Sequence, residues 1–283
     1  MADKHILQWS SGRLDFSNGC IVMGVLNVTP DSFSDGGLYL DCERAVDRAL
    51  QMQSEGAGII DIGAESTRPG SAPVPAQQQI ERAVPVIRKL SGQLDIPVSI
   101  DTSDPCVAGA ALDAGASLIN DVNALRAAGM SELVCRYAVP VILMHMKGSP
   151  ETMQTSAVYE DVVAEVRQFL LERAAMLEKM GVDREMIFID PGIGFGKTHE
   201  HNLMLLKYIE EFVQTGYKVL AGTSRKSFLG ALTSQTEPSQ RMAATAATVA
   251  WCAQRGCSVV RVHDVGEMVD VVKVIHAVNG VRQ

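Results

Sequence analysis

Short runs of apolar residues recur along the chain, and a polar side chain closes each of six of them. The best defined run, residues 187–189, is followed by Asp190, Pro191 and a series of glycines. The other runs end at Asp61, Asp101, Asn120 with Asp121, His145 and His263. Apolar runs rich in β-branched residues and bounded by turn residues are typical of strands buried on both faces. One polar strand end can arise by chance, whereas six indicate a site assembled from the ends of strands.

Helical periodicity fills the gaps between these runs. It predicts a helix from about Cys42 to Glu55 and a longer one over residues 158–180. The inward-facing residues of the first should be Ala45, Val46, Ala49 and Met52, and those of the second Val162, Val166, Phe169, Leu177 and Met180. Glycines precede the next strand at positions 56, 115, 216 and 256. Glycine just past a helix adopts the left-handed conformation that other residues resist.

The alternation predicts eight strands, at residues 20–26, 58–62, 97–101, 117–120, 140–145, 186–190, 217–222 and 258–263. Eight strand–helix units in about 250 residues are typical of an α/β fold of the TIM (β/α)8 barrel class. A doubly wound open sheet is the alternative, but the dinucleotide fingerprint G-x-G-x-x-G fails because Lys197 stands where its third glycine belongs. We expect one domain over residues 1–283, with 1–17 a short N-terminal segment that forms a hairpin before the first barrel strand.

Composition narrows the classes of partner. The 25 Lys and Arg against 33 Asp and Glu give a net charge of −8, which argues against a general nucleic-acid or membrane-surface binder. A local basic cluster can still bind a small anion. The six cysteines show no zinc-like spacing, the chain carries no signal peptide, and no apolar run approaches ~18 residues. We therefore expect a cytoplasmic protein with reduced thiols.

Acidic and amide side chains form the first candidate group. In a TIM barrel the carboxyl ends of the strands and the loops after them build the active site, so Asp101, Asn120 and Asp190 should converge there. Carboxylates and an amide suit a ligand with a donor-rich edge, such as an amino-pyrimidinone, because a carboxylate accepts two hydrogen bonds from a cyclic amidine. The simpler alternative is that these residues tie down loops.

Basic residues form the second group. The segment Ser224-Arg225-Lys226-Ser227 follows the seventh predicted strand, and Arg261 and His263 end the eighth, where this fold frequently holds phosphate. Arginine binds an oxyanion through two hydrogen bonds, and lysine acts as a point charge. A solvated basic turn is the alternative. It is less favoured because Arg261 and His263 alternate with valines on a strand that should be buried.

Two long polar loops, residues 27–40 and 63–77, should border the same mouth. Thr67 and Arg68 would close over a substrate there, unless the second loop is simply surface. Asn27 offers an amide oxygen to Mg²⁺, which keeps its waters and takes most other ligands from substrate phosphates. His199 and His201 lack a third ligand at usable spacing, and we interpret them as surface residues.

Together these motifs resemble the dihydropteroate synthases, the pterin-binding family of folate biosynthesis that sulfonamides inhibit. The resemblance spans nearly the whole chain, with matching segments at residues 24–37, 63–70, 99–102, 119–121, 143–146, 190–197, 224–227 and 261–264. Ala64 departs from the family pattern, in which many members have glycine. This change is minimal and puts little in doubt.

The resemblance implies that 4-aminobenzoate displaces diphosphate from 6-hydroxymethyl-7,8-dihydropterin diphosphate along an S_N1-like path. It assigns Asp101, Asn120, Asp190 and Lys226 to the pterin, and Arg261 and His263, with Asn27 through Mg²⁺, to the diphosphate. It places Phe33, Thr67, Arg68, Pro69, Phe195, Ser224, Arg225 and Ser227 around the aminobenzoate, and adds Met144 and Gly222 to the substrate-binding set. The residues expected to act in catalysis are Asp101, Asp190, Lys226, Arg261 and His263. The family is usually homodimeric, and the helix expected at residues 242–253 could support that contact.

Two other functions stay open at this point. A pterin-binding barrel that transfers a methyl group from a reduced folate would share the acidic pocket, but has no need of a diphosphate site. A non-catalytic pterin- or phosphate-binding protein would carry out neither methyl transfer nor the displacement of diphosphate. Release of diphosphate from the pterin substrate in the presence of aminobenzoate would distinguish all three.

Overall fold

Eight parallel strands close into a barrel, in which each strand pairs with the next along the chain and the last pairs with the first. The computed structural model describes residues 5–29, 37–66, 71–148 and 157–281. The barrel strands are β3 (Ile21–Asn27), β4 (Ile59–Gly63), β5 (Val98–Asp101), β6 (Leu118–Asp121), β7 (Val141–Met144), β8 (Ile187–Asp190), β9 (Lys218–Ala221) and β10 (Val259–Val262). Each overlaps one predicted strand, so the TIM barrel is confirmed and an open sheet is excluded. The assignment of the whole chain to one domain stays a prediction.

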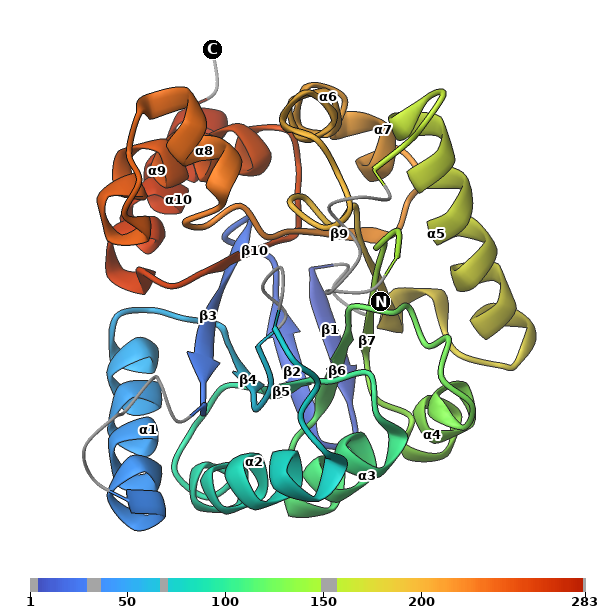
Figure 1. Cartoon of the computed structure of the whole chain (residues 1–283), viewed down its shortest axis with the longest axis vertical. Coiled ribbons are helices and arrows are strands. Elements are labelled where there is room, and N and C mark those ends of the chain that lie inside the picture. Colours follow the sequence, from blue (N-terminus) through green and yellow to red (C-terminus); the bar gives the residue numbers. More distant parts are fainter. Residues whose placement is uncertain (1–4, 30–36, 67–70, 149–156, 282–283) are drawn as a thin grey trace.

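Helices surround the strands (Figure 1). They are α1 (Gly37–Ser54), α2 (Ala76–Leu90), α3 (Pro105–Ala114), α4 (Met130–Tyr137), α5 (Val162–Lys179), α6 (His199–Lys207), α7 (Glu210–Val213), α8 (Ser227–Thr233), α9 (Met242–Gln254) and α10 (Val265–Gly280), with short 3-10 turns η2 (Arg184–Met186) and η3 (Pro238–Arg241). None of the helices that the structure describes is long and apolar enough to cross a membrane.

The long helix α5 is shorter than the sequence pattern predicts. Its N-cap is Asp161, whose side chain accepts hydrogen bonds from the backbone N–H groups of Val163 and Ala164, so Val158 lies outside the helix. Met180 is the C-cap and is 40% exposed. The prediction that Met180 faces inward is therefore wrong, because the helical period no longer applies once the helix has ended.

Glycines end several of the helices as expected. Gly56, Gly115, Gly216 and Gly256 all have positive φ angles, between 82° and 116°. At Gly115 a Cβ atom would also lie only 2.5 Å from the Ser91 side chain. Each glycine therefore allows the chain to turn directly from a helix into the next strand, as these positions predict.

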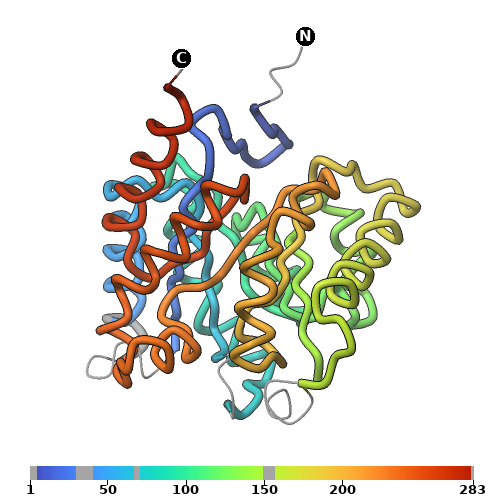
Figure 2. The backbone as a smooth tube through the Cα atoms, turned by 90° about the horizontal axis from the view of Figure 1, so that it is seen from above, coloured from blue at the N-terminus to red at the C-terminus, as the bar shows by residue number. Residues whose placement is uncertain are grey.

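An N-terminal hairpin covers the amino end of the barrel. Strands β1 (Ile6–Trp9) and β2 (Gly12–Asp15) pair antiparallel within the predicted N-terminal segment. The ring of Phe16, which follows β2, lies 6.4 Å from that of the fully buried Phe188 on β8. Figure 2 shows the hairpin and the end of α10 at the same end of the barrel. A site for substrates is thus left to the opposite, carboxyl end.

Polar residues gather inside the barrel near that carboxyl end. In the strand register Asp61 lies opposite Ser99, and Asp101 lies opposite both Gly63 and Asn120. Residues in register on neighbouring parallel strands point the same way. The polar side chains therefore form one layer across β4, β5 and β6.

Candidate active site

Arg261 on β10 is the centre of the polar layer. Its Nε donates to Oδ2 of Asp61 at 2.6 Å, and its Nη2 donates to Oδ2 of Asp101 at 2.7 Å. Asn120 Nδ2 donates to the same Asp61 oxygen at 3.0 Å. This network joins β10 to β4, β5 and β6 and holds the guanidinium in one orientation.

The burial of these groups determines their charge states. Burial raises the pKa of Asp101 to about 7, while the Arg261 charge lowers it and the Asp61 charge raises it. Burial lowers the pKa of Arg261, but Asp61 and Asp101 outweigh that effect and the pKa is raised overall. Arg261 is therefore a permanent cation, and Asp101 is the carboxyl group whose charge state a ligand can change.

Three buried oxygens in this layer have no hydrogen-bond partner among the described residues. They are Asp61 Oδ1, Asp101 Oδ1 and Ser99 Oγ. Buried polar atoms in proteins are nearly always hydrogen-bonded. Their position at the barrel mouth indicates that hydrogen-bond donors of a ligand, or of ordered water, belong here.

Asp190 closes β8 on the other side of the barrel. Its Oδ1 accepts the backbone N–H of Gly192 at 2.7 Å, and no donor among the described residues occupies its second oxygen. Burial raises the pKa of Asp190 to about 6, while the Gly192 N–H and the Lys226 charge lower it. Asp190 is thus a fixed carboxylate with one oxygen available to a ligand.

Lys226 lies next to Asp190 and above an aromatic ring. Its Nζ is 4.0 Å from the centroid of the Phe195 ring. Burial lowers the pKa of Lys226 to about 8, the Arg261 charge lowers it further, and Asp190 raises it. A Cβ atom on Gly194 would lie 2.9 Å from Lys226 Cδ, so glycine at this position makes room for the lysine. Phe195 packs in turn on the apolar cluster of Val122, Met144 and Met146.

His263 follows β10 and contacts the loop after β9. Ser224 Oγ lies 3.0 Å from His263 Nδ1 and accepts the backbone N–H of His263 at 3.2 Å. Burial lowers the pKa of His263 to about 3, and the charges of Arg261 and Arg225 contribute. The imidazole is therefore neutral. We assign its proton to Nε2, because Ser224 can then donate to Nδ1, and this leaves one N–H for a ligand.

Arg225 links the loop after β9 to the loop after β10. Its Nε donates to Asp264 Oδ2 at 3.1 Å, and its Nη2 pairs with Oδ1 of the same carboxylate. Its backbone, at φ 60°, donates to Thr245 Oγ1 and accepts from Arg241 Nη1 at 2.8 Å. The guanidinium that the sequence places near the aminobenzoate is thus already paired with a carboxylate.

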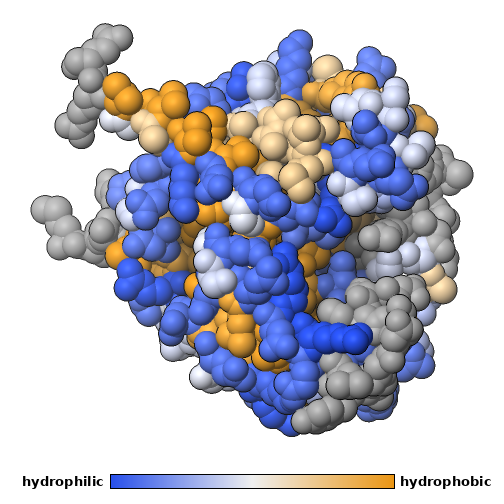
Figure 3. Space-filling view, turned by 90° about the vertical axis from the view of Figure 1, so that its left-hand side faces the viewer, coloured by the Kyte–Doolittle hydropathy of each residue, from blue (hydrophilic) through white to orange (hydrophobic). Residues whose placement is uncertain are grey.

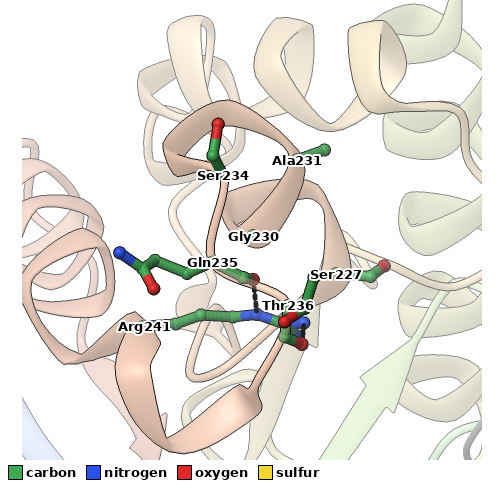
Figure 4. Close-up of a pocket in the computed structure, with 7 residues that line it drawn as sticks. All are labelled: Ser227, Gly230, Ala231, Ser234, Gln235, Thr236 and Arg241. Carbon is green, nitrogen blue, oxygen red and sulfur yellow. Dashed lines mark hydrogen bonds between the residues drawn. The ribbon is translucent and has the colours of Figure 1, made fainter.

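Ser227 begins α8 and lines a surface pocket of about 520 Å³. Figure 4 shows Arg241 reaching beneath α8, where it donates to the carbonyl oxygens of Gln235 and Thr236. Ser227 is exposed, whereas Ser224 and Lys226 lie against the barrel mouth. The structure therefore separates the four residues of the basic segment into two inner and two outer ones.

Asn27 and Gly222 lie close to the central network. A Cβ atom on Gly63 would lie 3.5 Å from Asn27 Oδ1 and 3.8 Å from Asp101 Oδ2, and one on Gly222 would lie 3.9 Å from Arg261 Cβ. The Asn27 side chain makes no hydrogen bond to another described residue. A free amide oxygen at the mouth fits a hard cation such as Mg²⁺. The remaining expected residues, Phe33, Thr67, Arg68 and Pro69, lie outside the described residues.

Asp61 is a polar strand end to which the sequence pattern alone assigns no role. Asp61 lies inside β4 between Ile60 and Ile62 and is fully buried. The signal that could have found it is the one used for Arg261, since a charged residue within a buried strand requires a partner. Lys197 also received no role from the sequence pattern. It lies in the loop after β8 (Ile187–Asp190), so no buried strand marks it.

Comparison with known proteins agrees with this geometry. The model of the family described as "Pterin binding enzyme" matches residues 23–263. A dihydropteroate synthase of Synechocystis sp. is 43% identical over 93% of this chain and 91% of its own length. The structure of Xanthomonas albilineans dihydropteroate synthase with 4-aminobenzoic acid is 46% identical with a TM-score of 0.90, covering 95% of this chain and 96% of that one. The same enzyme in complex with 7,8-dihydropteroate is 43% identical with a TM-score of 0.86, covering 95% and 97%. The chain therefore belongs to the dihydropteroate synthase family of pterin-binding enzymes.

Proposed function

We propose that the chain joins 6-hydroxymethyl-7,8-dihydropterin diphosphate to 4-aminobenzoate and releases 7,8-dihydropteroate and diphosphate. The observation that carries this proposal is the juxtaposition of two unlike surfaces at one mouth. Asp101 and Asp190 each keep one oxygen without a donor among the described residues, and the Arg261 cation lies at the same mouth. A ligand with a donor-rich ring at one end and a polyanion at the other satisfies both surfaces. The relatives that hold 4-aminobenzoic acid and 7,8-dihydropteroate support the same substrates.

The pterin is held by the acidic side of the mouth. The amino-pyrimidinone edge donates to Asp190 and Asp101, and Asn120 completes the set of hydrogen bonds. Met144, which packs with Val122 and Met146 in one apolar cluster, covers the ring face. Lys226, above the Phe195 ring, donates to an acceptor atom of the pterin.

The diphosphate is held by the basic side. Arg261 keeps its charge because two carboxylates support it, and neutral His263 adds an N–H donor beside Ser224. Asn27 would hold Mg²⁺ together with substrate oxygens. When bound, Mg²⁺ supplies neutralisation of the diphosphate charge.

The reaction needs little proton transfer from the protein. The C–O bond to the diphosphate breaks with its electron pair leaving on the diphosphate, and positive charge develops on the pterin methylene. Asp101 and Asp190 stabilise that charge because they are fixed in place before the reaction. The arylamine, already unprotonated at neutral pH, then forms the C–N bond and loses a proton to solvent. Phe195 and Ser224 border the aminobenzoate, together with Arg225, Ser227 and the residues outside the described part of the chain.

A diphosphate-release assay tests this function. The chain should release diphosphate from the pterin substrate and form dihydropteroate only when aminobenzoate is present. Transfer of a methyl group from a reduced folate would instead identify the methyltransferase alternative. Tight pterin binding with no turnover of either substrate would identify a binding protein.

Removal of Mg²⁺ should lower the rate of diphosphate release, because the leaving polyanion then relies on Arg261 and His263 alone. We expect a chelator to abolish most activity and added Mg²⁺ to restore it. Asn27→Ala should raise the Mg²⁺ concentration needed for half-maximal rate. Binding of 6-hydroxymethyl-7,8-dihydropterin, which lacks the diphosphate, is the control and should not respond to the chelator. An unchanged rate in the chelator would contradict the metal assignment.

Pterin affinity should fall as the pH drops below about 7, where Asp101 takes up a proton, and the share due to Asp190 should begin below about 6, at roughly tenfold per pH unit. Asp190 has a pKa of about 6 and must be ionised to accept the pterin donors. Its folded pKa lies above the ordinary value of 3.8, so between about pH 4 and 6 this group makes unfolding less favourable as the pH falls. Protonation of Asp190 therefore lowers the affinity for the pterin without lowering the stability of the fold. Calorimetric titration with 6-hydroxymethyl-7,8-dihydropterin should show this slope, and Asp190→Asn should weaken it.

The proposed assembly is a homodimer that works in the cytoplasm. Apolar side chains are exposed on three neighbouring helices: Leu232 on α8, Met242 on α9, and Val274 and Val278 on α10. Figure 3 shows apolar side chains gathered along the upper part of this face. A second copy covering them would remove an apolar surface from water. The cytoplasmic assignment is supported by the six free cysteines.

A further inference from the structure

Lys197 is a buried lysine that forms no ion pair with a carboxylate among the described residues, although the charge of Asp190 acts on it. It ends the glycine-rich loop after β8 and is only 8% exposed. Its Nζ donates to the carbonyl oxygens of Phe195 at 2.9 Å and His145 at 3.2 Å, and lies 3.1 Å from His145 Nδ1. Burial lowers the pKa of His145 to about 2, so the imidazole is neutral and can accept from the lysine. Three partners thus surround the Lys197 amino group, whose pKa burial lowers to about 7.

The three partners lie at a seam between two loops. A Cβ atom on Gly192 would lie 2.0 Å from the His145 carbonyl oxygen, and one on Gly196 would lie 2.5 Å from the Lys147 carbonyl oxygen. The loops after β7 and β8 are therefore in direct backbone contact. Lys197 joins them at this contact, since it binds His145 after β7 and Phe195 after β8.

Phe195 is the side chain that this seam presents to the mouth. Its backbone N–H donates to Gly192 O at 3.0 Å, and its carbonyl oxygen is bound by Lys197. Its ring lies under Lys226 Nζ and packs on Met144 and Met146. The position of the ring therefore depends on hydrogen bonds at both ends of its own backbone.

We infer that Lys197 is a positioning residue, which fixes the Phe195 ring and thereby sets the affinity for aminobenzoate without touching either substrate. This inference rests on the proposed function, which assigns Phe195 to the aminobenzoate. A lysine that only held the fold together would affect stability and both substrates alike. A lysine that acts through Phe195 affects one substrate.

The test is a double-mutant cycle on the full chain, read as separate KM values for the two substrates. Lys197→Met keeps the length of the side chain and removes its donors. At about pH 8, where Asp190 stays ionised without the Lys197 charge, we expect it to raise KM for aminobenzoate about tenfold and KM for the pterin diphosphate less than twofold. In a Phe195→Ala background the same change should have no further effect on KM for aminobenzoate, because the ring it positions is gone. Lys179→Met, on the exposed end of α5, is the matched control and should change neither value.

Two outcomes would overturn the inference: an equal rise in both KM values, or a full tenfold effect that persists without the Phe195 ring. Lys197→Gln provides a second variant if Lys197→Met does not fold, with the same expected preference for aminobenzoate. Failure of the proposed function is distinguishable, because the unmodified chain would then form no dihydropteroate in the same assay.

Discussion

Asp190→Asn should lower kcat/KM for the pterin diphosphate by roughly 30- to 1,000-fold, or about 2–4 kcal/mol of transition-state stabilisation. Asparagine has the same shape and can still accept the Gly192 N–H that Asp190 Oδ1 accepts at 2.7 Å. The change therefore leaves the loop in place and removes only the negative charge. That charge is needed twice, first to bind the pterin donors and then to stabilise the positive charge on its methylene.

Diphosphate release at saturating aminobenzoate measures this loss, and a thermal unfolding curve shows whether the fold is intact. The matched control is Asp183→Asn, which lies before the amino end of the same strand, where asparagine caps the 3-10 turn equally well. It should leave kcat/KM unchanged. A loss of less than threefold for Asp190→Asn would be inconsistent with a charge that stabilises the transition state.

The fold could be predicted because its signals are local. A buried parallel strand is a continuous apolar run, a helix has its own period, and glycines 56, 115, 216 and 256 mark the turns between them. The errors were local as well. Met180 fits the period of α5 but stands after its last residue, and no periodicity shows where a cap such as Asp161 begins a helix.

The members of the site could also be predicted, but not their pairing. Asp101, Asn120, Asp190 and Arg261 stand at polar positions in apolar strands, and the barrel topology brings such positions to one mouth. Nothing local shows that Arg261 binds Asp61 and Asp101, or that the Arg225 guanidinium is paired with Asp264. Which side chains pair depends on how the fold brings together residues that are up to 200 positions apart in the chain. The roles predicted for Phe33, Thr67, Arg68 and Pro69 stay predictions.

Asp61 shows what such a pairing contributes. It has no substrate role in the proposed function, yet one of its oxygens binds both Arg261 and Asn120. Asp61 thereby orients two residues at once: Arg261, which binds the diphosphate, and Asn120, which binds the pterin. Its charge also acts on Asp101, whose pKa it raises through the like charges of the two carboxylates. Asp61 therefore influences Arg261, Asn120 and Asp101 at once.

Asp61→Asn should consequently lower kcat/KM about 100-fold, or ~2.7 kcal/mol, with a fold that persists. Loss of one partner from a buried ion pair costs roughly 3–5 kcal/mol of stability when the other charge is left alone, but here Arg261 keeps Asp101, so the loss should be smaller. The pKa of Asp101 should fall below about 7, since a like charge beside it is gone. Carbon NMR of the Asp101 carboxyl group measures that shift directly.

A matched control separates this effect from the loss of any buried carboxylate. Asp121 is as buried as Asp61 but binds Ser103 Oγ and the backbone N–H groups of Asn123 and Leu125. Asp121→Asn should therefore lower thermal stability with little change in kcat/KM, and should lower the pKa of Asp101 less than Asp61→Asn does, because the charge of Asp121 acts on Asp101 more weakly than that of Asp61. If Asp61→Asn behaved in the same way, with the Asp101 pKa unmoved, Asp61 would be only a structural partner of Arg261. If kcat/KM and the Asp101 pKa fall together, the orientation of Arg261 and the charge state of Asp101 depend on a residue that never meets the substrate.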